Sequence, residues 1–411
     1  MHGRRDAGSG RQMIRPLHIL VHDYAGHPFT ADLSRGLAAL GHRVDHAFFA
    51  DDPGPKGQLT RQPTDPFNLA FHPVAINQPY SKSNFLIRRS GDLAYGRQLA
   101  KLVIDLRPDL VLSGNTPTEA QAALLRACTH AGARFVYWCQ DFYAIAVDRI
   151  LRRKLPGFGA LIGAYYRHLE RGQMRHADHL IHITDSFRPQ SEAWGVPSER
   201  TSVVPNWGAI NALPVMDRDT MWAEEQSLNQ GNRYLYAGTL ALKHDPTFLT
   251  ALALSLPAND AVITTSAGIG AERLADLKDP RLNCLALQPI DRFAEVLASA
   301  DVLLAMIERE AGTFSVPSKI LSYLCAGRPI VLAAPDDNLA AQIIRGAGAG
   351  AVVAPEDRAG FIAAAKAFGA DPALSAEVGA RGRAYAEATF KLPTITRRFE
   401  AIFAQVMETH Q

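Results

Sequence analysis

At 411 residues the chain is too long for one compact core, and we expect two domains. Charged residues make up 20% of the sequence and the formal net charge is +2, which argues against a disordered acidic chain and against a basic nucleic-acid-binding protein. Residues 1–12 are polar and basic, unlike a signal peptide, and no apolar run reaches transmembrane length. The cysteines form no CxxC pair and predict a reducing, cytoplasmic compartment; they are Cys128, Cys139, Cys284 and Cys325.

The first half of the chain alternates short apolar strands with amphipathic helices. A strand is predicted at 17–22, a turn through Gly26 follows it, and a helix is predicted at 31–40. Segment 51–84 is rich in proline, glycine and polar residues and is predicted to be an irregular loop over the surface. Further strands are predicted at 44–50, 110–113, 134–139, 179–184 and 201–205, with helices at 93–106 and 118–131.

A basic amphipathic stretch runs from Arg149 to Leu169. Arginine, lysine and histidine side chains flank the apolar segment GFGALIGAYY. Such a stretch is suited to lie on an anionic membrane surface, and arginines at a helix end are also commonly just solvated. Both interpretations stay open from the sequence.

Periodicity lapses from Gly208 to Asn232, and we place the domain boundary there. A second α/β series follows. Because open parallel sheets bind ligands at the carboxyl ends of their strands, the sequence predicts two doubly wound domains facing a central cleft. Strands are expected at 234–237, 261–265, 283–287, 301–306, 330–333 and 351–353, and helices at 246–255, 272–277, 293–299, 319–326, 339–345, 360–368, 373–389 and 393–407.

The segment from Phe314 to Ala333, FSVPSKILSYLCAGRPIVLA, predicts a turn, a helix and a buried strand. We expect the hydroxyl of Ser318 to cap this helix and Gly327 to end it. The first turn, with Lys319 in it, is suited to bind a phosphate, because free N–H groups and the positive end of the helix dipole meet there. An ordinary capped surface helix is the alternative.

Several segments in the same order resemble family 4 glycosyltransferases of the GT-B fold. They are GTLALKHDP, SAGIGAE, ADVLLAMI, SVPSKILSYLCAGRPIV and GAGAVVAPED in the second half, and GHRV, YWCQDFY, ERGQMRHADHLIHIT and SVVPNW in the first. The likeness is greatest to bacterial colanic-acid, O-antigen and exopolysaccharide enzymes. It implies an acceptor-binding Rossmann-like domain at 13–210, a donor-binding one at 211–391, and a C-terminal helix at 392–411 that packs back on the first domain.

The resemblance also implies an activity. It is the transfer of a sugar, of the hexosyltransferase type, from a nucleotide diphosphate sugar to an acceptor hydroxyl, without metal or other cofactor and with retention. The acceptor implied is a sugar, in particular a polyprenyl-diphosphate-linked one in surface polysaccharide synthesis, which would place a cytoplasmic enzyme at the inner leaflet of the membrane. Two alternatives stay open: a catalytically degenerate sugar-binding partner subunit, and a GT-B sugar-nucleotide epimerase.

The resemblance implies site residues at the positions that match the family's motifs. The sequence departs from the family pattern at two places. Thr239 occupies the place of a family arginine, while Ser322 and Phe314 occupy the places of a family glutamate pair. Asp141 is the predicted catalytic residue near the acceptor hydroxyl, with a helix-capping aspartate as the alternative. We do not expect a bound metal, since the adjacent pairs Asp51–Asp52 and Asp336–Asp337 lie in turn-like contexts and form no convincing Asp-x-Asp site. The predicted donor-binding residues are Gly26, Gly238, Thr239, Lys243, Glu310, Ser318, Lys319 and Ser322.

The last predicted helix, 393–407, has an apolar face that the second domain does not need. Phe399, Ile402, Phe403 and Val406 share that face. Leaving them exposed would cost about 1.5–3 kcal/mol for each large side chain, so we expect the helix to pack on the first domain. With the 208–232 linker it would form a two-strand hinge.

Overall fold

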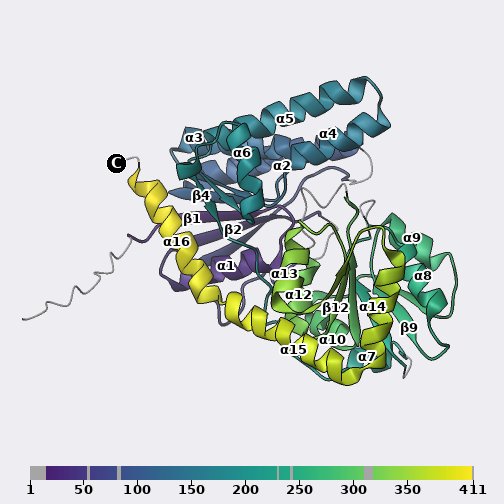
Figure 1. Ribbon diagram of the computed structural model, residues 1–411. Coiled ribbons are helices and arrows are strands. Elements are labelled where there is room, and N and C mark those ends of the chain that lie inside the picture. The colour runs from purple at the N-terminus through teal and green to yellow at the C-terminus, as the bar shows by residue number, and fades with distance from the viewer. Residues whose placement is uncertain are drawn as a thin grey trace, which may run out of the picture.

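The computed structural model describes residues 15–52, 56–80, 85–228, 231–240, 244–309 and 318–409. Two lobes, each a parallel β-sheet with helices on both faces, lie next to each other (Figure 1). Apolar runs such as Ile19–Val21 and Leu303–Ala305 are fully buried, as expected for strands covered on both sides. The predicted α/β, doubly wound fold class is therefore confirmed.

The first sheet has seven parallel strands in the order β3-β2-β1-β4-β5-β6-β7. The order reverses between β1 and β4, which pair in register from Ile19 opposite Leu110 to Asp23 opposite Gly114. Such a reversal opens a crevice at the carboxyl ends of the two strands, where doubly wound sheets bind ligands. The strands are β1 His18–Asp23, β2 Arg43–Phe49, β3 Leu69–Val74, β4 Leu110–Gly114, β5 Arg134–Cys139, β6 His179–His182 and β7 Thr201–Val203.

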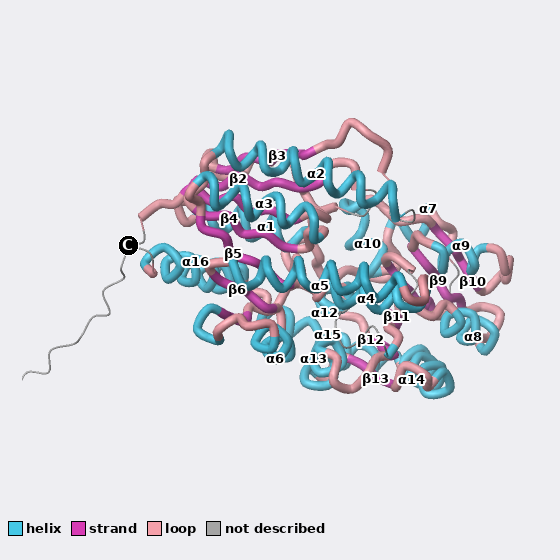
Figure 2. Tube along the Cα trace, turned by 90° about the horizontal axis from the view of Figure 1, so that it is seen from above, coloured by secondary structure: helices cyan, strands magenta, loops and turns pink. Residues whose placement is uncertain are grey.

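Helices cover both faces of this sheet. α1 packs with the C-terminal α16 on one face, and α2, α3 and α5 pack together on the other (Figures 1 and 2). The α-helices of this lobe are α1 Pro28–Ala39, α2 Phe85–Leu106, α3 Thr118–Ala131, α4 Tyr143–Lys154, α5 Phe158–His176 and α6 Arg188–Ala193, with 3-10 turns η1 Asp185–Phe187 and η2 Ser198–Arg200.

The second sheet has six parallel strands in the order β10-β9-β8-β11-β12-β13, and its order reverses between β8 and β11. One face packs on α8, α9 and α14, and the other on α10, α12 and α13. The strands are β8 Arg233–Ala237, β9 Ala261–Thr265, β10 Leu282–Leu285, β11 Val302–Met306, β12 Ile330–Ala333 and β13 Gly350–Val353. The helices are α7 Met221–Glu225, α8 Thr247–Ser255, α9 Ile269–Ala275, η3 Ile290–Arg292, α10 Phe293–Ala298, α12 Lys319–Ala326, α13 Leu339–Ala347, α14 Arg358–Ala370, α15 Pro372–Thr389 and α16 Leu392–Glu408.

The C-terminal helix crosses from the second lobe to the first, as expected. In Figure 1, α16 continues from α15 and runs to the side of α1. The Phe399 ring lies edge-on to the Trp138 ring, with centroids 5.0 Å apart, and Phe399 and Phe403 are fully buried. Gly36 of α1 makes room for the helix, since a Cβ there would lie 2.3 Å from the hydroxyl oxygen of Thr396.

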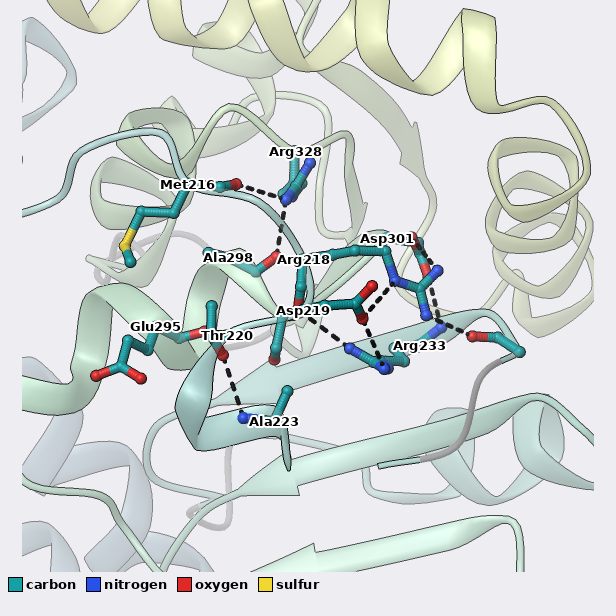
Figure 3. A network of polar contacts seen from close by, with 12 residues as sticks. Met216, Arg218, Asp219, Thr220, Ala223, Arg233, Glu295, Ala298, Asp301 and Arg328 are labelled. Carbon is teal, nitrogen blue, oxygen red and sulfur yellow. Dashed lines mark hydrogen bonds and ion pairs between the residues drawn. The ribbon is translucent and has the colours of Figure 1, made fainter. Parts of the chain in front are cut away.

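The segment between the two sheets is held mainly by the second lobe. Arg218 donates two hydrogen bonds of 2.9 Å to the carboxylate of Asp301, and the buried Arg233 donates to Asp219 (Figure 3). Arg328 donates to the carbonyl oxygens of Met216 and Ala298. These bonds hold residues 216–219 on the second lobe, so we expect any hinge in this segment to bend closer to Trp207.

Two segments differ in detail from the sequence predictions. The expected irregular segment 51–84 contains the edge strand β3, so that prediction was wrong there. β3 is half-exposed and includes Pro73, which weakens its alternating pattern, and a proline is tolerated at a sheet edge. The basic stretch 149–169 is divided between α4 and α5, because Pro156 and Gly157, with φ of +85°, break the helix.

Candidate functional site

Four side chains meet at the carboxyl edge of the first sheet, where the strand order reverses. Asp23 ends β1, and its buried carboxylate accepts hydrogen bonds from His27 Nδ1 at 2.9 Å and Thr30 Oγ1 at 3.1 Å. Asn115, which follows β4, donates to the other carboxylate oxygen at 3.1 Å. Its backbone is left-handed, with φ of +51°, a conformation that asparagine tolerates. The arrangement aims polar groups at the place where such sheets bind ligands.

His27 is a half-buried member of this group. Its side chain is 32% exposed, and it stacks on the ring of Phe29. Burial opposes the charged form, but the carboxylate of Asp23, with smaller effects of Asp52 and Asp141, outweighs burial and raises the pKa of His27. For Asp23, burial is outweighed by His27 and by the hydrogen bonds, and the pKa is lowered. The pairing therefore favours the cationic form of the imidazole beside the buried Asp23 carboxylate.

Asp141 lies beside this group, after β5, and its side chain is exposed. The alternative that Asp141 caps α4 is not supported, because the N-cap residue is Phe142. Instead the buried Glu170 of α5 accepts hydrogen bonds from the N–H groups of Tyr143 and Ala144, at 3.1 and 3.0 Å. Burial raises the pKa of Glu170 to about 8 despite these bonds. Glu170 therefore anchors the start of α4, and with it the loop that carries Asp141.

A small pocket of about 70 Å³ adjoins Asp141. Gln140 lines it with a side chain that is 7% exposed, and its amide nitrogen has no hydrogen-bond partner within the described residues. A buried amide without a partner is costly, so a ligand oxygen at this place would be favoured. The residues lining the pocket are Asn115, Thr116, Gln121, Tyr137, Trp138, Gln140, Asp141 and Tyr143.

Two histidines of the first sheet, His22 and His182, are both buried. His22 lies 2.8 Å from Ser113 Oγ and 2.7 Å from the Tyr95 hydroxyl, and burial lowers its pKa to about 3. It is therefore a neutral structural histidine.

Gly26 has a structural reason to be glycine. Its φ is +70°, and a Cβ would lie 2.6 Å from Leu59 Cδ1. Its carbonyl also accepts the N–H of Gly57 at 2.8 Å. The predicted turn at Gly26 thus has direct support, while contact of its backbone with a donor stays a prediction.

Gly238 and Lys319 come together at the carboxyl edge of the second sheet. Gly238 follows β8 with φ of +120°, and a Cβ there would lie 3.5 Å from Cε and Nζ of Lys319. The ammonium group of Lys319 lies 3.5 Å from the ring centroid of Tyr236, a cation–π contact. Thr239 is exposed next to them, and its carbonyl accepts the Tyr236 hydroxyl. A lysine and an unobstructed backbone therefore lie at the second strand-order reversal.

The helix start at Ser318 differs from the prediction. Ser318 has helical φ and ψ of −60° and −24° and makes no side-chain cap hydrogen bond, so the predicted hydroxyl cap was wrong. α12 does end at Gly327 in the left-handed conformation, as expected. Ser322 is half-buried on α12. The predicted donor residues Lys243 and Glu310, and Phe314 at a family glutamate position, lie outside the described residues.

The sequence reasoning missed Asp23, His27, Asn115 and Gln140. A signal existed for three of them. Asp23 and Gln140 directly follow a predicted strand, Asn115 comes two residues after one, and parallel strands place their carboxyl ends at one edge. Across the described ranges, no group of three or more His, Cys, Asp or Glu side chains is arranged to hold a metal ion. None of the helices described here combines the length and apolar character needed to cross a bilayer.

Comparison with known proteins gives one family match. Residues 26–207 match the family model of the Glycosyl transferase 4-like domain. These residues begin at Gly26 and end at Trp207, and they include most of the first sheet with Asn115 and Asp141. No curated protein matches the chain in sequence.

Solved structures resemble the whole chain at low sequence identity. HepE of Anabaena, in complex with UDP, has a TM-score of 0.66 at 17% identity, over 94% of this chain and 100% of that chain. Sucrose-phosphate synthase of Thermosynechococcus elongatus has a TM-score of 0.71 at 14% identity, over 95% and 99%. A trehalose 6-phosphate synthase of Burkholderia multivorans has a TM-score of 0.65 at 11% identity, over 97% and 100%. The chain therefore has the GT-B glycosyltransferase fold, and its first sheet lies largely within a segment that matches the Glycosyl transferase 4-like domain.

Proposed function

We propose that the protein is a glycosyltransferase that moves a sugar from a nucleotide diphosphate sugar to an acceptor hydroxyl. The observation that carries this proposal is the pair of polar sites at the strand-order reversals of a GT-B fold, one around Asp23, His27 and Asp141 and one around Gly238 and Lys319. Structures of the similar HepE hold UDP, UDP-glucose, and UDP with glucose, which supports a nucleotide sugar as donor.

The two sites are suited to different roles in the reaction. Breaking a sugar–phosphate bond leaves negative charge on the diphosphate, which lysine side chains and helix N-termini stabilise. Lys319, in the first turn of α12, is suited to that role, and Lys243 is its predicted partner. In the first lobe, Asp141 would accept the proton of the acceptor hydroxyl, and the amide nitrogen of Gln140 would bind an acceptor oxygen. We expect this chemistry to need no metal and to retain the anomeric configuration.

A lipid-linked sugar is the acceptor we propose, in the synthesis of a surface polysaccharide. The support is the basic amphipathic stretch 149–169 together with the likeness of the sequence to exopolysaccharide enzymes. A degenerate sugar-binding subunit is the second candidate, because Ser322 stands where family members carry a glutamate. A sugar-nucleotide epimerase is the least supported, since we identify too few acidic residues for it.

Lys319→Ala is expected to weaken nucleoside diphosphate binding roughly tenfold or more, because a charge-assisted contact contributes about 1.5–3 kcal/mol. Calorimetric titration of UDP, GDP and ADP into the wild type and the variant measures this. Lys366→Ala removes an exposed lysine of the same lobe and should leave binding unchanged. Equal affinities of Lys319→Ala and wild type would remove Lys319 from the donor site.

A further inference from the structure

The hairpin of α4 and α5 carries large apolar side chains on its surface. Phe158 and Leu161, at the start of α5, are 75% and 71% exposed. The other apolar side chains exposed on the hairpin are Ile150, Leu155 and Tyr165, each between 47% and 50% exposed. Figure 1 shows the loop between the two helices projecting beyond the sheet. We name these five side chains the hairpin patch.

The patch is not needed to hold the hairpin together. The two helices approach closely at glycines: a Cβ on Gly159 would lie 2.1 Å from the carbonyl oxygen of Leu151, and one on Gly163 would meet Asp148. Tyr166 and Glu170 face inward and are buried. The two helices therefore pack against each other without the side chains of the patch, which lie on the opposite, outer side of the hairpin.

The charges around the patch have one sign. The sequence contains no aspartate or glutamate from Arg149 to Leu169. The preceding acid, Asp148, is buried and pairs with Arg152 and Arg167, at 2.8 and 3.5 Å. The basic side chains exposed on the hairpin in this range are Arg149, Arg152, Arg153, Arg167 and His168.

We propose that the hairpin patch docks on an anionic lipid bilayer. Apolar side chains at the loop enter the boundary between headgroups and acyl chains, and the surrounding arginines bind lipid phosphates. Charge complementarity selects this occupant. The exposed charged side chains described on the hairpin between residues 149 and 169 are all basic, which disfavours a basic partner or a second copy of the same surface.

The position of the hairpin relates membrane docking to access of the acceptor. This step of the argument rests on the proposed function. α4 begins beside Asp141 and ends at the loop, and its 12 residues span about 18 Å at 1.5 Å per residue. A bilayer at the loop therefore lies about one helix length from the predicted acceptor site. A lipid-linked sugar could reach Asp141 while its lipid stays in the membrane, so the hairpin selects membrane-borne acceptors.

Sedimentation with vesicles tests the proposal. The full-length protein is expected to pellet with phosphatidylglycerol–phosphatidylcholine vesicles, to pellet far less with phosphatidylcholine alone, and to be released by salt. Replacing Leu155, Phe158 and Leu161 together by serine should lower partitioning roughly tenfold or more. Arg149→Gln with Arg153→Gln should lower it by a similar factor and weaken its salt dependence.

A control variant carries the same number of changes elsewhere. Leu254, Leu277 and Ile290 are exposed apolar residues of the second lobe, and their triple serine variant should bind vesicles like the wild type. In Phe158→Trp the new tryptophan should shift its emission to the blue and be quenched by brominated acyl chains, whereas the new tryptophan of Leu254→Trp should not. Unchanged thermal unfolding of every variant shows that the fold is intact.

The outcomes separate this proposal from the proposed function. Equal pelleting of the wild type and the hairpin serine variant, or loss of a dimer in that variant by light scattering, would overturn the docking proposal. Hydrolysis of a nucleotide sugar in solution does not require a membrane, so the serine variant should keep it. Retained hydrolysis without vesicle binding rejects only the docking, and vesicle binding without turnover of any nucleotide sugar rejects only the transferase.

Discussion

Truncation of the chain after Lys391 is expected to lower the free energy of unfolding by several kcal/mol and to abolish most sugar transfer. The removed helix buries Phe399 and Phe403 completely against the first lobe. Loss of a buried phenylalanine side chain typically costs about 3–5 kcal/mol, and truncation removes two together with the His42–Glu400 contact. Chemical denaturation followed by tryptophan fluorescence measures the change, because Trp138 and Trp207 both face Phe399.

Point variants make the same test without removing backbone. Phe399→Ala should lose about 3–5 kcal/mol, whereas Gln405→Ala, on the exposed side of the helix, should change stability little. Nucleoside diphosphate affinity should persist in the truncated protein where it stays folded, because Gly238 and Lys319 belong to the second lobe. A truncated protein with wild-type stability and transfer would show that the crossing helix is dispensable.

Asp141→Asn is expected to lower sugar transfer by a factor of about 10²–10⁴ with little change in nucleoside diphosphate affinity, since a positioned acid or base typically contributes that much. The substitution keeps the shape of the side chain and removes its charge. Initial rates at saturating donor, together with calorimetric affinities, separate the two effects. Wild-type turnover of Asp141→Asn would leave this aspartate without a catalytic role.

The pH dependence of sugar transfer provides a separate test of the role of His27. The pKa of His27 is raised mainly by Asp23, and further by Asp52 and Asp141, so its cationic form persists to higher pH than that of free histidine. If the His27 cation stabilises the leaving diphosphate, the rate of transfer should fall as pH rises through this raised pKa. His27→Gln should transfer more slowly, and its rate should no longer show that fall at alkaline pH. Identical pH profiles of the wild type and His27→Gln would show that His27 only supports the turn after β1.

Much of the fold could be predicted because most elements carry strong local signals. α3 at 118–131, β5 at 134–139 and β9 at 261–265 were predicted with the same bounds that the structure shows. Their apolar periodicity reflects burial on defined faces, and turn residues flank them. β3 was missed because a half-exposed edge strand lacks that pattern.

The candidate site was harder to predict, because its residues come from loops after three different strands. Asp23, Asn115 and Asp141 are far apart in sequence and meet only through the strand order β1-β4-β5, which periodicity does not give. The placement of the half-buried His27 imidazole depends on the turn at Gly26, and the anchoring of the Asp141 loop depends on Glu170, 29 positions further along the chain. Lys319 was identified from its place in the first turn of a predicted helix and Gly238 through the family resemblance, and the structure places them side by side.

The central claim is tested most directly by turnover of a panel of nucleotide sugars, with and without a lipid-linked sugar acceptor. Mass spectrometry of the products follows release of the nucleoside diphosphate and the fate of the sugar. We predict slow hydrolysis of one nucleotide sugar by the protein alone and faster transfer when the acceptor is added, both reduced by Asp141→Asn. Binding of nucleoside diphosphate without any turnover would identify a degenerate subunit, release of an epimerised sugar would identify an epimerase, and neither binding nor turnover would contradict a glycosyltransferase altogether.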